Sequence, residues 1–232
     1  MIASPEELAA NLREVRARIE AAAARAGRAA SEVRLIAVTK TMPAEAVTWA
    51  RELGVADLGE NYVGELADKR PLAPDATWHF IGTLQSHTAH RVAEDAHVVH
   101  SAVPGRAVER LARRAAERGR TIPVLIQVDQ AGRGTGVEPR DIERAAAELA
   151  AIEGVQPVGL MTLPPPPERP GDSRPFFAEL RAMGEHLREG LPELRELSMG
   201  MSLDYEIAVE EGASMVRVGT ALFGARPSRP GN

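Results

Sequence analysis

The sequence predicts an α/β fold, a single (β/α)8 TIM barrel with an extra N-terminal helix. Eight short, apolar, β-branched runs alternate along the chain with alanine-rich stretches of helical periodicity. Such alternation is typical of parallel strands joined by crossover helices. The 232 residues suit one compact barrel, whereas the rival architecture, an open doubly wound sheet, would have fewer strands.

The extra helix is predicted over residues 4–26. Ser4 is a typical N-cap, Pro5 suits the first helical position, and Glu6 adds negative charge to the first turn. Apolar residues then recur at spacings of three and four, as on one face of a helix: Leu8, Leu12, Val15 and Ile19. This helix precedes the first strand and therefore stands outside the alternation.

The predicted strands cover residues 33–39, 56–59, 77–82, 97–101, 122–129, 155–161, 196–199 and 215–218. The predicted helices that follow them cover residues 43–53, 62–70, 88–94, 104–118, 139–152, 174–188 and 203–211. The runs LIAV and PVLIQV are apolar without interruption, as strands buried on both faces should be. The proline-rich segment 163–172 is predicted to be a stiff surface loop, because consecutive prolines fit neither a helix nor a central strand.

Composition restricts the classes of function. The chain has 28 basic and 33 acidic residues and a formal net charge of −5, so its charge gives no reason to expect nucleic acid or an anionic membrane as a partner. The absence of cysteine excludes disulfides, thiolate metal sites and cysteine nucleophiles. No apolar run is long enough for a transmembrane helix, and the N-terminus lacks the apolar core of a signal peptide. We therefore expect a cytoplasmic protein with no nucleic acid and no membrane partner.

Lysine is rare in this chain. Only Lys40 and Lys69 are lysines, and every other basic residue is an arginine. A lysine amine can lose its proton and attack a carbonyl group, whereas a guanidinium stays charged. Lys40 directly follows the first predicted strand, which places it at the mouth of the barrel, where active sites gather. Lys69 lies on a predicted helix and is expected to be exposed and dispensable.

The loops after the last two strands suit a phosphate group, which barrels often bind there. Ser202 is predicted as the N-cap of the helix over residues 203–211, and Gly219 and Thr220 offer close backbone approach and a hydroxyl group. A lysine facing such a cradle could hold an aldehyde-bearing phosphate ester, and pyridoxal 5′-phosphate (PLP) bound as a Schiff base is the leading candidate. The plainer alternatives are that Ser202 only caps a helix and that Arg217 is a buried ion-pair partner.

Two histidine pairs have spacings that occur in metal sites. They are His87 with His90 and His97 with His100, but no third ligand joins either pair on an evident common face. Solvated or core histidines are the better interpretation. We therefore expect no metal site.

Several segments resemble one known family. The segments LIAVTK, GENYVGE, WHFIGTLQS, GLMTLPP and LSMGMSLDYEIAVEEGASMVRVGTALFGAR are similar, in the expected order, to those of the pyridoxal phosphate homeostasis proteins, also called the YggS or PROSC family. Members of this family have the barrel of the N-terminal domain of bacterial alanine racemase. The resemblance implies one alanine racemase N-terminal-like, PLP-binding barrel over residues 1–232.

The resemblance also implies roles for particular residues. Lys40 matches the lysine that forms the Schiff base, and Arg217 matches the arginine that faces the pyridine nitrogen. The other matching positions line the ring or the phosphate: Asn61, Met201, Ser202, Gly219 and Thr220. Departures from the family pattern at Thr83, at residues 87–88 and in the shorter loop 130–138 affect loop details and secondary cofactor contacts, and leave the Schiff-base and phosphate assignments unchanged.

The expected function is to hold PLP in intracellular PLP homeostasis without significant turnover, so we predict no catalytic residue. A cationic Arg217 disfavours a proton on the ring nitrogen and thereby weakens carbanion chemistry. The resemblance to alanine racemase also implies a second base from a further domain, which we expect to be missing. We expect a monomer that passes PLP to apo-PLP-enzymes. The alternatives are a PLP-dependent amino-acid racemase or decarboxylase, and a class I aldolase that uses Lys40 on a sugar phosphate.

Overall fold

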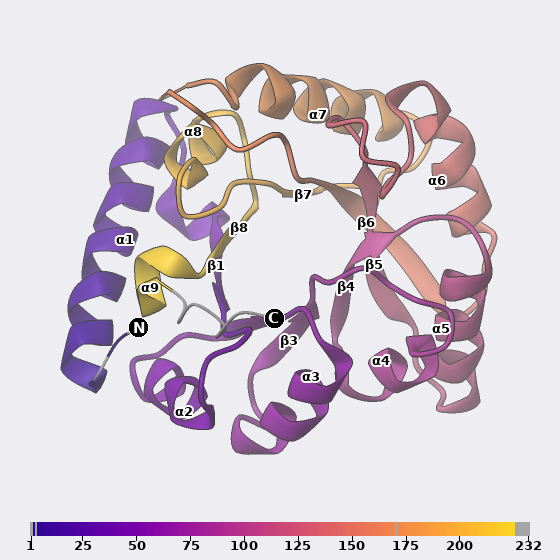
Figure 1. Ribbon diagram of the computed structural model, residues 1–232. Helices are drawn as coiled ribbons and strands as arrows, with labels where there is room; N and C mark the ends of the chain where they lie inside the picture. Colours follow the sequence, from indigo (N-terminus) through magenta and orange to yellow (C-terminus); the bar gives the residue numbers. More distant parts are fainter. Residues whose placement is uncertain (1, 3, 170, 226–232) are drawn as a thin grey trace.

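Eight parallel strands close into a barrel in the computed structural model, which describes residues 2, 4–169 and 171–225. The strands follow one another around the barrel in chain order, and β1 pairs with β8 to close it, with Ile36 opposite Arg217. Figure 1 looks along the barrel and shows the helices as an outer ring. The predicted (β/α)8 barrel is confirmed.

All eight predicted runs form strands. The predicted ends differ from the observed ends by at most two residues, at the third strand, which ends at Phe80. The strands are β1 (Arg34–Val38), β2 (Asp57–Glu60), β3 (Thr77–Phe80), β4 (Val98–Ala102), β5 (Ile122–Val128), β6 (Val155–Thr162), β7 (Glu196–Ser198) and β8 (Met215–Val218).

The predicted helices form as well, with three late starts and one addition. The described helices are α1 (Pro5–Arg25), α2 (Ala44–Glu52), α3 (Val63–Lys69), α4 (Ala89–Asp95), α5 (Arg106–Glu117), α6 (Ile142–Ala150), α7 (Arg174–Leu187), α8 (Tyr205–Glu210) and α9 (Thr220–Phe223). Helices α5 and α8 begin two residues later than predicted, and α6 begins three residues later, after a 3-10 turn over Pro139–Asp141. Helix α9 was not predicted, because its four residues are too few for a periodic pattern.

Helix α1 is the extra N-terminal helix. The Ser4 side chain accepts a hydrogen bond from the Glu7 backbone N–H at 3.3 Å, as expected for an N-cap. Its apolar face is buried, and the Asn11 side chain donates to the Leu222 carbonyl in α9 at 2.9 Å. The helix therefore completes the outer ring beside α8 and α9 (Figure 1).

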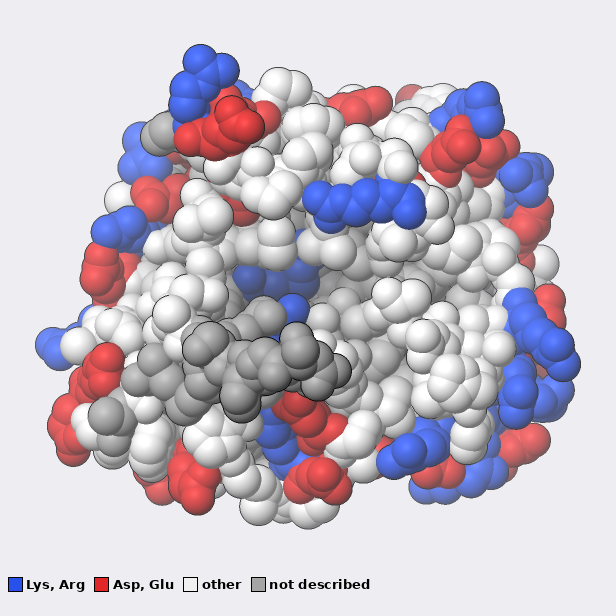
Figure 2. Space-filling model, viewed as in Figure 1, with Lys and Arg blue, Asp and Glu red and all other residues white. Residues whose placement is uncertain are grey.

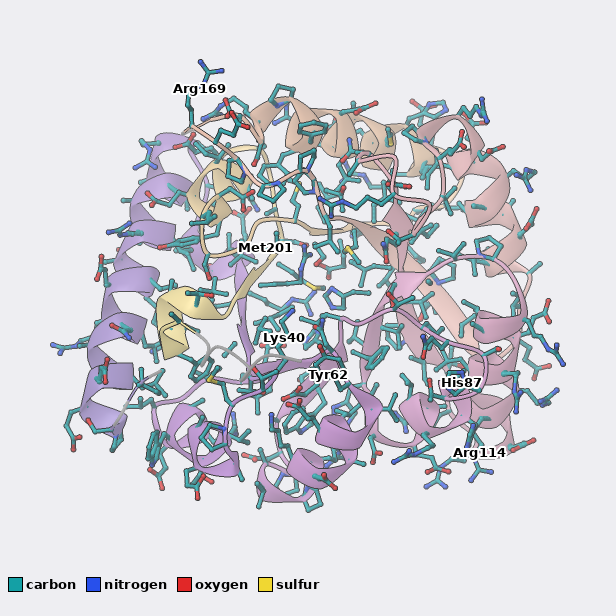
Figure 3. The ribbon with its side chains drawn as sticks, in the orientation of Figure 1. Lys40, Tyr62, His87, Arg114, Arg169 and Met201 are labelled. Atoms are coloured by element: carbon teal, nitrogen blue, oxygen red, sulfur yellow. The ribbon has the colours of Figure 1, made fainter. Side chains whose placement is uncertain are left out.

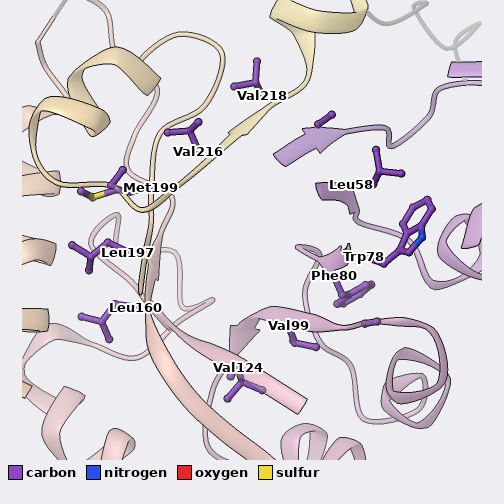
Figure 4. Packing of buried hydrophobic residues seen from close by; sticks show 14 of the residues in the cluster. Leu58, Trp78, Phe80, Val99, Val124, Leu160, Leu197, Met199, Val216 and Val218 are labelled. Carbon is purple, nitrogen blue, oxygen red and sulfur yellow. The ribbon is translucent and has the colours of Figure 1, made fainter. Parts of the chain in front are cut away.

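The two faces of the strands have different surroundings. Trp78 and Phe80 belong to the apolar cluster between sheet and helices, part of which is drawn in Figure 4. His79 lies between them in β3 and points the opposite way, into the barrel, because side chains alternate along a strand. The interior holds a small apolar cluster of Val98, Leu125 and Met161 together with buried polar side chains. Within residues 2, 4–169 and 171–225, no helix is long and apolar enough to cross a membrane.

Candidate functional site

A cavity of 310 Å³ opens at the carboxyl ends of the strands. Apolar walls come from the end of β1, the residue after β3 and the proline-rich loop, and include Val38, Ile81 and Pro166. The space-filling view shows blue Lys and Arg atoms at the bottom of this central hollow (Figure 2). All the predicted cofactor residues line this one cavity: Lys40, Asn61, Met201, Ser202, Arg217, Gly219 and Thr220.

Lys40 lies just beyond β1, and Figure 3 shows both Lys40 and Met201 near the centre of the ring. The backbone around it is constrained. Thr41 has a positive φ of 62°, which is uncommon for a residue other than glycine. Its N–H donates to Glu65 Oε2 at 2.7 Å, and Thr39 Oγ1 donates to Glu60 Oε1 at 2.7 Å. The carboxylates of β2 and α3 thus hold both neighbours of Lys40.

The prediction that Lys69 is exposed is wrong. Lys69 is only 5% exposed, and its ammonium donates to the Thr39 carbonyl at 2.7 Å, to Glu60 Oε1 at 2.8 Å and to Glu65 Oε2 at 2.7 Å. Lys69 is the last residue of α3, and its ammonium reaches the carbonyl of the residue after β1. Burial raises the pKa of Glu60, and the Lys69 ammonium opposes that rise. Lys69 therefore braces the segment that carries Lys40.

Arg217 lies in β8 with only 4% exposure. Its guanidinium donates to Ser198 Oγ and, at 2.9 Å, to the Thr162 carbonyl. Burial lowers the pKa of Arg217 to about 10, so the group stays a cation at neutral pH. Its hydrogen-bond partners among the described residues are neutral oxygens, which does not support the alternative of a buried ion pair.

The prediction that Ser202 caps the helix over residues 203–211 is wrong. Helix α8 begins at Tyr205 with Asp204 at the N-cap position, and Asp204 Oδ1 accepts from the Met201 N–H at 2.7 Å. The Ser202 hydroxyl instead accepts from the N–H groups of Gly219 at 3.3 Å and Ala221 at 3.1 Å. Ser202 therefore joins the loop after β7 to the start of α9.

Gly200 shapes the loop that carries Met201 and Ser202. Its φ is +88°, and a Cβ atom there would lie 2.5 Å from the Ala208 Cβ and 2.9 Å from the Tyr205 Cα. The loop therefore packs directly against α8, and only glycine fits this position.

Asn61 supplies an unpartnered polar atom. Its Oδ1 is buried and has no hydrogen-bond partner among the described residues, although the residue lines the cavity. The choice between amide oxygen and nitrogen is an assignment, so the group can donate or accept. A buried polar atom without a partner is costly, and this one favours a polar ligand. The residues present thus fit a ligand with an aldehyde, a phosphate and further polar groups.

His97 and His100 point to opposite faces of the sheet. His97 Nδ1 accepts from the Trp78 backbone N–H at 2.9 Å on the outside of the barrel, whereas His100 lies inside it. His87 lies at the periphery in Figure 3. Within the described part of the chain, no three His, Cys, Asp or Glu side chains gather as metal ligands.

Sequence reasoning missed the residues around Arg217 and the true role of Lys69. His79, Thr162 and Ser198 are fully buried, and they lie near the arginine or are linked to it. Their strands were predicted, but which side chains share the barrel interior depends on strand register. The available signal was the alternation in β3, which places a histidine between two large aromatic residues.

Comparison with known proteins identifies close relatives. The family described as alanine racemase, N-terminal domain, matches residues 7–227. Two proteins named pyridoxal phosphate homeostasis protein are 39% and 38% identical to this chain. The one from Pseudomonas aeruginosa matches over 223 residues, 94% of this chain and 96% of its own. The one from Aquifex aeolicus matches over 220 residues, 93% of this chain and 96% of its own.

A solved structure also matches most of this chain. PipY of Synechococcus elongatus with PLP bound has a TM-score of 0.82 and 36% sequence identity. The match covers 94% of this chain and 100% of that chain.

Proposed function

This chain belongs to the alanine racemase N-terminal domain family and, within it, to the pyridoxal phosphate homeostasis proteins, and we propose that it binds PLP in intracellular PLP homeostasis. It holds PLP as a Schiff base on Lys40 without significant turnover. The observation that carries the proposal is that one cavity is lined by a lysine, a buried arginine and the two loops after β7 and β8. A relative of 36% identity has PLP bound. The barrel unit is proposed to span residues 1–232.

The cavity suits a ligand of this size and chemistry. Its 310 Å³ lies within the range of about 300 to 1,000 Å³ that is common for small-molecule sites. Bound PLP would supply an aldehyde that condenses with amines and a ring that withdraws electrons. Lys40 provides the amine. The phosphate side is proposed to comprise Met201, Ser202, Gly219 and Thr220, with Asn61 beside the ring.

Arg217 is the main reason for proposing a holder rather than an enzyme. A guanidinium can donate a hydrogen bond to the ring nitrogen but does not protonate it, because its pKa of about 10 keeps it cationic at neutral pH. Carbanion chemistry is weaker when the ring nitrogen is unprotonated. We therefore propose no catalytic residue. A PLP-dependent racemase or decarboxylase with Lys40 as its one base is the alternative.

The deciding experiment is the visible absorption spectrum of the purified protein with added PLP, beside that of Lys40→Ala. We expect a yellow band in the wild type and none in the variant. Because the chain has only two lysines, borohydride reduction followed by peptide mass mapping should place the label on Lys40 and leave Lys69 unlabelled. A spectrum without the band in the wild type, or a band that persists in Lys40→Ala, would overturn the proposal.

A second experiment separates the holder from the enzyme. The loaded protein is incubated in D2O with a panel of amino acids, and α-proton exchange is followed by NMR. The holder should exchange no faster than free PLP, whereas a racemase or decarboxylase would exchange or consume its substrate. Transfer of PLP to apo-PLP-enzymes, the monomeric state and the cytoplasmic location stay predictions. Reactivation of an apo-PLP-enzyme and size-exclusion chromatography test the first two.

A further inference from the structure

An unbroken line of hydrogen bonds crosses the barrel interior. Asp57 Oδ1 lies 2.9 Å from His79 Nε2, and His79 Nδ1 lies 2.8 Å from His100 Nε2. His100 Nδ1 lies 2.8 Å from Ser198 Oγ, which accepts from Arg217. We call these five residues the inner relay. They come from five strands, β2, β3, β4, β7 and β8, and link the amino end of β2 to the cavity.

The inner relay occupies space that a barrel ordinarily fills with branched apolar side chains. His79, His100 and Ser198 are fully buried, and the Asp57 side chain is 14% exposed. A buried polar group is costly unless it is hydrogen-bonded, and a network with one broken link is worse than an apolar core. Every histidine nitrogen in the relay has a partner, so the network is complete.

The relay has a direction. Arg217 can only donate, so Ser198 accepts from it and has its own hydroxyl proton to give to His100 Nδ1. His100 then carries its proton on Nε2 and donates to His79 Nδ1, and His79 donates from Nε2 to the Asp57 carboxylate. Reversing the histidines would leave an unprotonated nitrogen facing a carboxylate. One tautomer of each neutral histidine therefore satisfies every link.

The charges around the relay agree with neutral histidines. Burial lowers the pKa of His79 despite the Asp57 carboxylate, and burial lowers that of His100 well below its ordinary value. Arg34 and Glu196 form an ion pair at the same end of the barrel as Asp57, with Nη2 and Oε1 2.5 Å apart. The relay thus has a carboxylate at one end, a guanidinium at the other and two neutral rings between them.

We propose that Asp57, His79, His100 and Ser198 are positioning residues that hold Arg217 as a fixed hydrogen-bond donor at the cavity. Each relay proton is donated away from the cavity, so the relay cannot supply a proton there unless both histidines change tautomer. This deepens the proposed function and rests on it for the effect on PLP: the relay keeps the ring nitrogen facing a donor that does not protonate it. The tautomers themselves are a property of the ligand-free protein.

Ser198→Ala breaks the relay beside Arg217 with little change in volume. Nitrogen-15 NMR of the ligand-free, histidine-labelled protein should show one Nε2–H tautomer for both His79 and His100 in the wild type. In Ser198→Ala, His100 loses the donor to Nδ1 and should show a mixture of tautomers. The matched control is Ser101→Ala, since Ser101 is also buried but donates to the Gly82 carbonyl outside the relay. The control should keep the wild-type tautomers.

The far end of the relay provides a second, conservative test. Asp57→Asn retains an oxygen that accepts from His79, so it should keep both tautomers, whereas Asp57→Leu should scramble them. Added PLP then gives the functional readout. Ser198→Ala and Asp57→Leu should change the shape of the visible band and lower PLP affinity by about tenfold. Asp57→Asn should keep the band shape and the PLP affinity of the wild type.

Each result of these experiments decides between the proposals. Unchanged tautomers in Ser198→Ala or Asp57→Leu, or a doubly protonated histidine in the wild type, would overturn the relay. Scrambled tautomers with unchanged PLP affinity and band shape would overturn its positioning role. A wild-type protein that shows the expected tautomers but no band with PLP would instead contradict the proposed function.

Discussion

At the scale of single residues, the two lysines have different tasks. Lys40 lines the cavity, while Lys69 is buried and donates to three oxygens. A compact ammonium suits three acceptors placed around one point, whereas a planar guanidinium does not. The position of Lys69 therefore suits a lysine better than an arginine.

Replacing Lys69 by methionine should destabilise the protein strongly. Lys69→Met leaves the Glu60 carboxylate buried without its cation, and breaking a buried ion pair from one side costs about 3 kcal/mol or more. Urea denaturation of the ligand-free protein measures this loss. The double variant Lys69→Met/Glu60→Gln removes both charges and should recover much of it. Equal stability of Lys69→Met and the wild type would contradict the bracing role.

At the scale of elements, the loops after β7 and β8 act together. Ser202 in the first loop accepts from two N–H groups in the second, and Gly200 allows the first loop to pack against α8. A short side chain thereby joins two segments at the predicted phosphate side. Ser202 therefore connects the two loops by hydrogen bonds and does not form the cap of α8 that the sequence alone had indicated.

Ser202→Ala should weaken the binding of phosphate-bearing ligands selectively. The variant removes a hydroxyl from the proposed phosphate side and leaves two N–H groups without their acceptor, so PLP affinity should fall by about tenfold. Pyridoxal, which lacks the phosphate, is the matched ligand and should bind almost as well as it does to the wild type. Titrations of both ligands, followed by absorption, test this. An equal loss for both ligands would place the phosphate elsewhere.

At the scale of the whole molecule, the two faces of the barrel strands differ. Buried polar side chains and a small apolar cluster lie inside the barrel, and the larger apolar cluster lies outside the strands. The outer layer of the sheet packs against the helices, as Figure 4 shows for Leu58, Val124 and Val216. The inner layer carries the line from Asp57 to Arg217. Stability therefore depends on apolar packing outside the strands and on the protonation state of the buried histidines inside the barrel.

Acid should destabilise the protein below about pH 6.5, the ordinary pKa of histidine. Burial lowers the pKa of His79, His97 and His100 in the folded state, so the unfolded chain binds more protons as the pH falls through this value. This part of the stability is fully present above that pH and is lost below it. Glu60 acts in the opposite direction, because burial raises its pKa.

Comparing the loss of stability in acid between variants separates the contribution of the histidines from that of Glu60. Urea midpoints at pH 8 and pH 5.5 are compared for the wild type, for His97→Gln and for His87→Gln, which replaces an exposed histidine. The loss on acidification should be smaller in His97→Gln and unchanged in His87→Gln. A wild-type protein that gains stability on acidification would contradict the predicted loss of stability in acid.

Much of this protein could be predicted from local pattern. The alternation of strands and helices determines the barrel, and a lysine at the end of β1 with loops after β7 and β8 must meet at its mouth, because all parallel strands end there. The predicted start of α8 and the predicted exposure of Lys69 were wrong, because both depend on particular hydrogen bonds that apolar periodicity does not reveal. Asp204 and the oxygens around Lys69 decide them.

The sequence by itself determined the fold, the end of the barrel that carries the cavity and seven of the residues that line it. Only the tertiary structure decided which polar side chains share the interior. Strand register places Asp57, His79, His100, Ser198 and Arg217 in one line, although residues 57 and 217 lie far apart in the chain. The physical reason is that a strand's pattern fixes which side chains alternate, while closure of the barrel fixes which of them meet.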